Sequence, residues 1–223
     1  MLKALIFDFN GIIVDDEPIH MRMFQKVLAE EGIRLSDKDY YRLYLGMNDK
    51  DCFTATLKKD GRRPTAKDID GLIRRKARHY RAFIAKHLIF FPGARAFVRR
   101  AARRYPLAIA SGALRSEIQY ILRQGGLRKC FPVIVAAEDV RNGKPHPEGF
   151  QKAMRLLNRK LSLRLKPEEC LVLEDSLEGI TAAKKAGMQC LALATSHPVS
   201  KLKKADFTAK GYKGLNLSFP EAR

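Results

Sequence analysis

The chain has 223 residues, of which 46% are hydrophobic and 30% are charged. This composition excludes a disordered or fibrous protein and fits one large domain, or a core domain with a smaller insert. Lys3 and Asp8 interrupt the apolar N-terminal run, and no run approaches the roughly 20 residues that span a bilayer. We therefore expect a soluble protein with no membrane segment and no secretory signal.

The chain is strongly basic, with 43 Lys and Arg against 24 Asp and Glu and a formal net charge of +19. Such a charge attracts anions, whether small phosphates, nucleic acid or acidic lipid. The basic residues are spread through 74–81, 99–104 and 201–204, without an aromatic-interleaved RNA motif or a Cys/His finger. We therefore favour a solvated basic surface over a dedicated nucleic-acid site, which stays open as an alternative, and expect no membrane partner.

The cysteines are widely scattered and show neither CxxC pairing nor a metal-binding spacing with histidine. They are Cys52, Cys130, Cys170 and Cys190. We expect free thiols in a reducing cytoplasm.

Short apolar segments alternate with helix-like segments and predict the core of the fold. The expected strands are 4–9, 106–111, 132–137, 170–175 and 190–194. The expected helices between them are 93–104, 115–124, 147–158 and 178–186. Strands that are apolar on both faces suit a buried parallel sheet. The pattern predicts an α/β fold with a doubly wound, Rossmann-like parallel sheet.

One long interval breaks this alternation. Residues 17–88 contain only amphipathic helical patterns, which predicts a helical cap domain inserted after the first strand. The core domain then comprises residues 1–16 and 89–223.

Polar residues follow the apolar segments at the points where the strands should end. They are Asp8, Ser111 with Gly112, Lys144, and Glu174 with Asp175. Ligands of open parallel sheets bind outside the carboxyl ends of the strands. Carboxylates, a hydroxyl with backbone N–H groups and a fixed cation are what phosphoryl transfer requires, because its catalysis consists chiefly of positioning and charge neutralisation.

Four motifs occur in order along nearly the whole chain: FDFNG, ASGA, GKPHP and LEDSLEGI. With a helical insert after the first motif, the sequence resembles the haloacid dehalogenase (HAD) superfamily, and most closely its β-phosphoglucomutase and phosphoglycolate phosphatase branch. Four ordered motifs indicate a fold and a superfamily but do not identify a substrate.

The resemblance implies a role for each matching residue. Asp8 is the nucleophile that forms an aspartyl phosphate, Ser111 with Gly112 binds phosphate, and Lys144 binds phosphate and orients Asp8. Read singly, Ser111 fits a turn residue and Lys144 a surface cation.

The resemblance also implies a Mg2+ site. Its ligands are Asp8, the backbone carbonyl of Asn10 and Asp175, with Glu174 nearby, directly or through water. Taken alone, Glu174 and Asp175 also fit caps of the helix that begins near Leu177.

Asn10 departs from the family pattern, in which the phosphatases and mutases carry a second aspartate. That aspartate protonates the leaving oxygen and then activates water, and an amide cannot carry a proton in this way. Such assistance is worth about 10² to 10⁴ in rate, so we expect a weakened phosphatase. The asparagine is an engineered change, a native feature of a branch with another proton carrier or a binding role, or a site of deamidation before Gly11.

The insert carries the candidate substrate-contacting residues. Asp15, Glu17 and His20 match the hinge region, where we favour a structural role for His20. In the loop that faces substrate in this branch, phosphoglucomutases carry an arginine, whereas this chain has Asn48 and Lys50 in the segment NDKD. A lysine does not reproduce a bidentate guanidinium, which counts against a mutase.

The sequence therefore predicts a cytoplasmic, monomeric, Mg2+-dependent phosphohydrolase that acts on a small phosphomonoester. A sugar-phosphate mutase and a phospholigand-binding protein with impaired catalysis are the alternatives.

Overall fold

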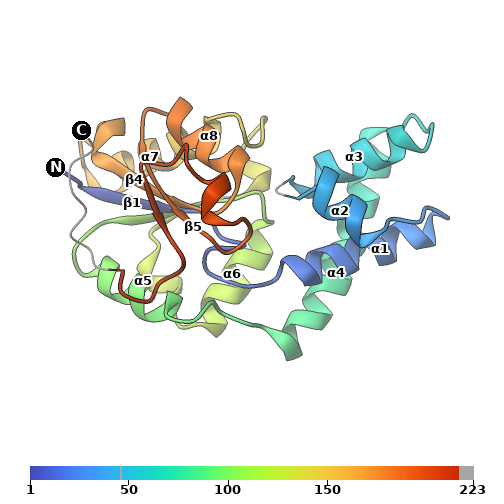
Figure 1. Ribbon diagram of the computed structural model, residues 1–223, viewed down its shortest axis with the longest axis horizontal. Helices are drawn as coiled ribbons and strands as arrows, with labels where there is room; N and C mark the ends of the chain where they lie inside the picture. Colours follow the sequence, from blue (N-terminus) through green and yellow to red (C-terminus); the bar gives the residue numbers. More distant parts are fainter. Residues whose placement is uncertain (46, 216–223) are drawn as a thin grey trace. The chain divides into compact units, whose positions relative to one another are not determined.

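The computed structural model describes residues 1–45 and 47–215 and divides the chain into two compact units. The core unit comprises Met1–Asp15 and Phe90–Arg223, and the cap unit comprises Asp16–Ile89. The boundaries expected from the sequence differ from these by one residue at each end of the insert. Each unit is described by itself below (Figure 1).

The core unit contains a six-stranded, wholly parallel sheet in the order β3-β2-β1-β4-β5-β6. The strands are β1 (Ala4–Phe7), β2 (Leu107–Ala110), β3 (Val133–Val135), β4 (Cys170–Glu174), β5 (Gln189–Leu193) and β6 (Phe207–Ala209). The sequence predicted the first five. It missed β6, whose three residues are partly exposed at the sheet edge and form no apolar run.

Alternate side chains of each strand pack on opposite faces of the sheet. On one face, residues such as Ala4, Ile6 and Val172 join a buried cluster with Phe150 and Ile180. Those last two residues come from helices α7 (Glu148–Leu161) and α8 (Leu177–Lys185), which cover this face (Figure 1).

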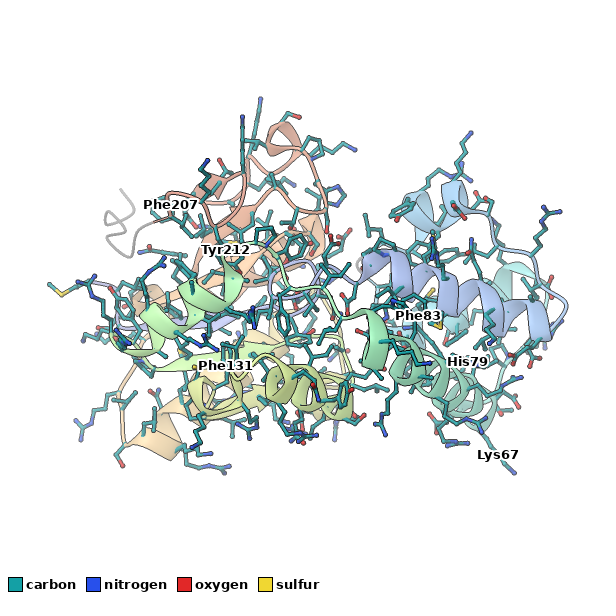
Figure 2. The ribbon with its side chains drawn as sticks, turned by 90° about the horizontal axis from the view of Figure 1, so that it is seen from below. Lys67, His79, Phe83, Phe131, Phe207 and Tyr212 are labelled. Atoms are coloured by element: carbon teal, nitrogen blue, oxygen red, sulfur yellow. The ribbon has the colours of Figure 1, made fainter. Side chains whose placement is uncertain are left out.

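On the other face, the ring of Phe7 packs edge-on against the rings of Phe97 and Phe131. The ring of Phe97 also contacts that of Tyr212, and Figure 2 labels Phe131 and Tyr212. Helices α5 (Ala94–Ala102) and α6 (Arg115–Gln124) belong to this side of the core (Figure 1). Burial of both sheet faces explains why the strands are apolar throughout.

Short 3₁₀ turns connect several of these elements: η1 (Arg128–Cys130), η2 (Ala137–Asp139), η3 (Pro167–Glu169) and η4 (Val199–Lys201). Gly187 follows α8 with a φ of 74°, as expected of a residue that terminates a helix.

The cap unit consists of four helices packed around one apolar cluster. They are α1 (Glu17–Glu30), α2 (Asp37–Leu43), α3 (Asp49–Lys59) and α4 (Ala66–His87). The ring centroids of Phe24 and Phe53 lie 4.7 Å apart within this cluster. Helix α1 has Pro18 in its first turn, where a missing N–H costs nothing. Within the described ranges, no helix is both long and apolar enough to cross a membrane.

Candidate active site

Strand pairing brings the first two acidic residues of the site together. Phe7 of β1 pairs with Leu173 of β4, and the backbone N–H of Asp8 donates a 2.9 Å hydrogen bond to the carbonyl oxygen of Leu173. Asp8 thus follows β1 at the level where Glu174 ends β4, and Asp175 comes next. The carboxyl ends of two adjacent central strands therefore present these acids at one edge.

The three carboxyl groups form a buried cluster. One oxygen from each of Asp8, Glu174 and Asp175 lies within 4.8 Å of the others. Burial, and then the charge of Glu174, raise the pKa of Asp8 to about 6, against the lowering effect of Lys144. Burial and the charges of Glu174 and Asp8 also raise the pKa of Asp175 well above its usual range. The cluster is an unfavourable concentration of negative charge unless a cation joins it.

Lys144 supplies one cation to this cluster. Its Nζ lies 2.8 Å from Oδ1 of Asp8 and donates a hydrogen bond to Oε1 of Glu174. Burial by itself lowers the pKa of Lys144, but the charges of Asp8 and Glu174 outweigh this effect and raise it. The lysine is therefore a permanently charged group fixed between two strand ends.

Glu174 is held by the loop that follows its own strand. Its Oε2 accepts hydrogen bonds from the backbone N–H groups of Asp175 (2.8 Å) and Ser176 (2.9 Å) and from the Ser176 hydroxyl (2.9 Å). Its side chain is fully buried. These contacts make Glu174 a rigid support for Lys144. The N-cap of α8 is Ser176, whose Oγ accepts from the Gly179 N–H, so neither Glu174 nor Asp175 is the cap.

Two glycines leave room for the carboxylates. A Cβ on Gly179 would come within 1.9 Å of Oε1 of Glu174, and a Cβ on Gly11 would come within 2.0 Å of Oδ2 of Asp175. Gly11 also has a φ of 73°, which other residues rarely adopt. The glycines of FDFNG and LEDSLEGI are thus required by the packing of the site.

Ser111 and Gly112 follow β2, the strand next to β1. The Ser111 N–H donates to the carbonyl oxygen of Val135 (3.0 Å), and its Oγ accepts from the Ala113 N–H (3.2 Å). The turn after β2 is therefore held with its hydroxyl and backbone at the same sheet edge as Asp8. This placement suits a phosphate cradle, although the same contacts also fit a plain turn residue.

The sequence did not point to two hydroxyl residues that follow β5. Ser196 Oγ donates a hydrogen bond to Oδ2 of Asp175, and Thr195 Oγ1 donates to the carbonyl oxygen of Gly11 at 2.6 Å. Ser196 therefore orients Asp175, and Thr195 holds the turn that follows Asp8. Their position after an apolar strand was the available signal, but serine and threonine at strand ends are common.

Asn48 and Lys50 lie in the cap unit. The Asn48 side chain caps α3, accepting from the Asp51 N–H at 2.9 Å and donating to Asp51 Oδ2 at 2.7 Å. Lys50 is an exposed residue in the first turn of α3. Asn48 thus has a local structural use, and the contact of either residue with substrate stays a prediction.

A buried polar network occupies the cap unit between α1, α3 and α4. Lys76, fully buried on α4, has its Nζ 2.8 Å from His20 Nδ1 and donates a short hydrogen bond to Asp49 Oδ1. His20 Nε2 lies 3.3 Å from Oδ2 of Asp16, which also accepts from the Tyr80 hydroxyl. His20, to which the sequence assigned no partner, thus links two charged groups.

The variant Asp49→Ala tests how much this network contributes to the stability of the cap unit. We expect Asp49→Ala to destabilise the protein by about 2–3 kcal/mol, because it leaves a buried ammonium group with fewer partners. The double variant Asp49→Ala/Lys76→Met should recover most of this loss, because no buried charge remains. Urea unfolding of the four proteins of this cycle, which includes Lys76→Met, measures both effects. A double variant no more stable than Asp49→Ala would show that the ion pair is not the cause.

The donor set of the core site fits a hard divalent cation such as Mg2+. Asp8 Oδ1 is buried, and among the described residues it has an ion-pair contact with Lys144 but no hydrogen-bond partner. Three buried carboxylates face one lysine, and oxygen ligands are those that Mg2+ prefers. The cluster therefore lacks positive charge that a cation would supply.

Comparison with known proteins identifies the family. The family described as haloacid dehalogenase-like hydrolase matches residues 5–193. The chain belongs to this family. The superfamily and the α/β fold predicted from the sequence are thereby confirmed.

Several relatives of this HAD-family chain are phosphatases. The phosphorylated carbohydrates phosphatase of Thermotoga maritima is 28% identical over 84% of this chain and 83% of its own length. The chloroplastic 5-amino-6-(5-phospho-D-ribitylamino)uracil phosphatase of Arabidopsis thaliana is also 28% identical, over 95% of this chain, which spans only 55% of that protein. These names agree with the sequence prediction of a phosphatase.

A solved structure with the same fold carries a relevant ligand. The crystal structure of CbbY from Rhodobacter sphaeroides, in a mutant with asparagine in place of an aspartate, contains xylulose-(1,5)bisphosphate. It matches this chain with a TM-score of 0.85 and 27% identity, covering 96% of each chain. The fold shared with this chain thus holds a small phosphorylated sugar in at least one relative.

Proposed function

We propose that this HAD-family protein is a Mg2+-dependent phosphohydrolase that cleaves a small phosphomonoester through an aspartyl phosphate on Asp8. The observation that carries the proposal is the buried cluster of Asp8, Glu174 and Asp175 with Lys144 at the strand ends. A structural ion pair would balance its charges, whereas this cluster has more carboxylates than cations. Such an excess suits a site that receives both a cation and a phosphate.

Asp8 is the proposed nucleophile because its carboxylate is buried yet anchored by its backbone to β4. One carboxylate oxygen forms a bond to phosphorus while the bond from phosphorus to the substrate oxygen breaks. Lys144 keeps Asp8 ionised and oriented and offers positive charge to the phosphate oxygens. A water molecule then attacks the aspartyl phosphate, which releases phosphate and restores Asp8.

The proposed cation ligands are Asp8, Asp175 and the backbone carbonyl of Asn10, with Glu174 beside them. When bound, Mg2+ neutralises charge on the phosphate and favours its approach to a carboxylate. Ser196 holds Asp175 and Thr195 holds the turn at Gly11, so both ligand-bearing segments are fixed in advance. Ser111 and the N–H of Gly112 bind the transferred phosphate in this proposal.

Asn10 limits both chemical steps in this proposal. It cannot protonate the departing alkoxide, and it cannot take a proton from the attacking water. The chain should therefore be a slow phosphatase with an intact binding site. A binding protein for phosphorylated ligands is the second candidate, favoured by this same residue.

The proposed substrates are phosphorylated sugars or polyols of low molecular weight. The named relatives act on phosphorylated carbohydrates and on a phosphoribityl compound, and CbbY binds a ketose bisphosphate. Mutase activity is less favoured, because NDKD at 48–51 has no arginine for a second phosphate. We place the protein in the cytoplasm as a monomer, and its free cysteines, three of them buried, support a reducing compartment.

Phosphate release from a panel of sugar and polyol phosphates tests the proposal. We expect slow, Mg2+-dependent, multiple-turnover release by the unmodified chain and none by Asp8→Asn. Saturable binding of the same compounds without any release, even over many hours, would favour the binding protein. Release that is equal in Asp8→Asn would remove Asp8 as the nucleophile.

Mg2+ should stabilise the protein, and more at neutral than at acidic pH. The pKa of Asp8 rises from 3.8 to about 6 on folding. The stabilisation that comes from the protonated form of Asp8 is therefore complete below pH 3.8 and is lost as the pH rises through 6. This loss, on the order of 3 kcal/mol, is what a bound cation offsets. We expect excess Mg2+ over chelator to raise the melting temperature by roughly 5–10 °C at pH 7.5.

The same experiment at pH 5 should give a clearly smaller shift, because Asp8 then binds a proton instead of the cation. Asp175→Asn serves as the control and should abolish the shift at both pH values. Equal shifts at pH 5 and pH 7.5 in the unmodified chain would contradict a carboxylate site of raised pKa. Differential scanning fluorimetry measures all of these values.

A further inference from the structure

One face of the core unit carries arginines without carboxylate partners. The proposed phosphatase site does not use these residues. Residues 90–137 contain nine Lys and Arg but only one acidic residue, Glu117, which is buried. In α5 the buried positions are Ala94, Phe97, Val98 and Ala101. The remaining surface of the helix and its C-terminal extension is almost wholly arginine: Arg95, Arg99, Arg100, Arg103 and Arg104.

Neighbouring elements extend this face. The Arg99 guanidinium donates to the carbonyl oxygen of Gly125 at 3.2 Å, which ties α5 to the end of α6. Arg95 lies over the ring of Phe90, and that ring fills the space beside Gly125. Both α5 and α6 contact η1, so exposed Arg123 and Lys129 and half-buried Arg128 belong to this same region. We call these eight residues the arginine face: Arg95, Arg99, Arg100, Arg103, Arg104, Arg123, Arg128 and Lys129.

Some basic residues elsewhere have carboxylate partners, which the residues of the arginine face lack. In the cap unit, Arg75 pairs with Glu30 and Glu31, and in the core Lys184 pairs with Asp206. Within residues 1–45 and 47–215, none of the eight residues of the face forms an ion pair with a carboxylate. A surface adapted only for solubility would intersperse both signs of charge.

The spacing of the arginines also works against the helix itself. Arg95 and Arg99 are like charges four residues apart within α5, and such a pair destabilises a helix. No acidic residue occurs in the first turn of α5 to offset them. A concentration of like charge that the helix itself does not favour points to a function beyond packing.

We propose that the arginine face binds the phosphodiester backbone of nucleic acid without reading its sequence. Arginine matches phosphate with a planar, two-pronged donor, and seven of the eight residues are arginine. A nine-residue helix is about 13 Å long, and a duplex presents a charge every roughly 1.7 Å of its axis. The basic residues along α5 thus extend over a length in which a duplex presents several phosphate charges.

A lipid surface suits this face less well. Helices that bind membranes place apolar side chains into the lipid beside their basic residues. The apolar side of α5 is buried against the core, and the exposed large hydrophobic residues described in the structure all lie outside 90–130. The solvated surface favoured from sequence does not explain why seven arginines without a carboxylate partner gather on this face.

Fluorescence anisotropy tests the proposal with DNA and RNA duplexes of about 20 base pairs that carry hydroxyl ends. Chelator is present, so the proposed phosphomonoester site is not engaged. We expect the logarithm of the affinity to fall linearly with that of salt concentration, with a slope of about −4 to −6. The variant Arg95→Gln/Arg100→Gln/Arg103→Gln/Arg104→Gln should make the slope shallower by about 3 to 4 and lower the affinity in 50 mM salt at least ~100-fold.

A second variant removes the same amount of charge from another part of the core unit. Lys201→Gln/Lys203→Gln/Lys204→Gln/Lys210→Gln neutralises four exposed lysines and should change affinity less than about 3-fold. Equal losses in the two variants would overturn the proposal in favour of diffuse attraction, and so would absence of binding by the unmodified chain. Equally tight, α5-dependent binding to phosphatidylserine vesicles would overturn it in favour of a lipid surface. Unchanged phosphatase activity and a cooperative thermal unfolding transition show that each variant is folded.

Discussion

Replacing Asn10 with aspartate is expected to raise phosphatase turnover by about 10² to 10⁴. The change replaces the amide nitrogen with an ionisable oxygen at a position next to the turn made by Gly11. The geometry around it, fixed by the Thr195 and Ser196 hydrogen bonds, does not need to change. An aspartate at this position can protonate the leaving oxygen in the first step and accept a proton from water in the second.

The gain should depend on the leaving group, which separates the two steps. A nitrophenyl phosphate has a stable leaving anion that needs no proton, whereas a sugar phosphate does not. Formation of the aspartyl phosphate should therefore gain more with sugar phosphates than with nitrophenyl phosphate. Asn10→Ala is the matched control and should give no gain. Intact-mass measurement excludes deamidated material, and equal turnover of the unmodified chain and Asn10→Asp would contradict the assigned role.

Replacing Gly179 with alanine is expected to lower turnover by at least ~100-fold, because a shift of about 1 Å at a reacting group has that effect. The new Cβ would lie 1.9 Å from Glu174 Oε1. Glu174 is fully buried and holds three hydrogen bonds on its other oxygen, so it cannot move into solvent. Displacement of Glu174 shifts Lys144, and the shift of Lys144 in turn moves Asp8. We also expect a loss of about 3 kcal/mol in stability.

Gly71 offers a matched control in another helix. It lies within α4, and a Cβ there meets nothing within 4 Å. Gly71→Ala should increase stability by about 0.5–1 kcal/mol and leave turnover unchanged. Both variants are best measured in the Asn10→Asp background, where turnover is fast. If Gly179→Ala retained full turnover, Glu174 would not be the support of Lys144 that the structure indicates.

The sequence could group the candidate site residues because a parallel sheet obeys a simple rule. Side chains that follow the carboxyl ends of strands meet at one edge, so Asp8, Ser111 and Asp175 could be placed together before the structure was known. Lys144 was added to them from its GKPHP motif alone, because it lies in a loop beyond η2 and not directly at the end of a strand.

The details that depend on three-dimensional packing were not accessible from the sequence. That Gly179 clears space for Glu174 follows from a side chain of β4 crossing the first turn of α8. The link between His20 and Lys76 spans 56 residues and two helices whose facing sides no periodicity identifies. The arginine face likewise emerges only when α5, α6 and η1 are seen as neighbours.

In the proposed mechanism, Asp8 forms a covalent aspartyl phosphate whose hydrolysis is slow because Asn10 cannot activate water. Rapid acid quenching of the unmodified chain after mixing with nitrophenyl phosphate and Mg2+, followed by mass spectrometry of the peptide that contains Asp8, tests it directly. We predict one phosphoryl group on Asp8 in a large fraction of the chains, with a matching burst of nitrophenolate, and none in Asp8→Asn. Steady release of nitrophenolate with no phosphoryl group on this peptide would contradict the account.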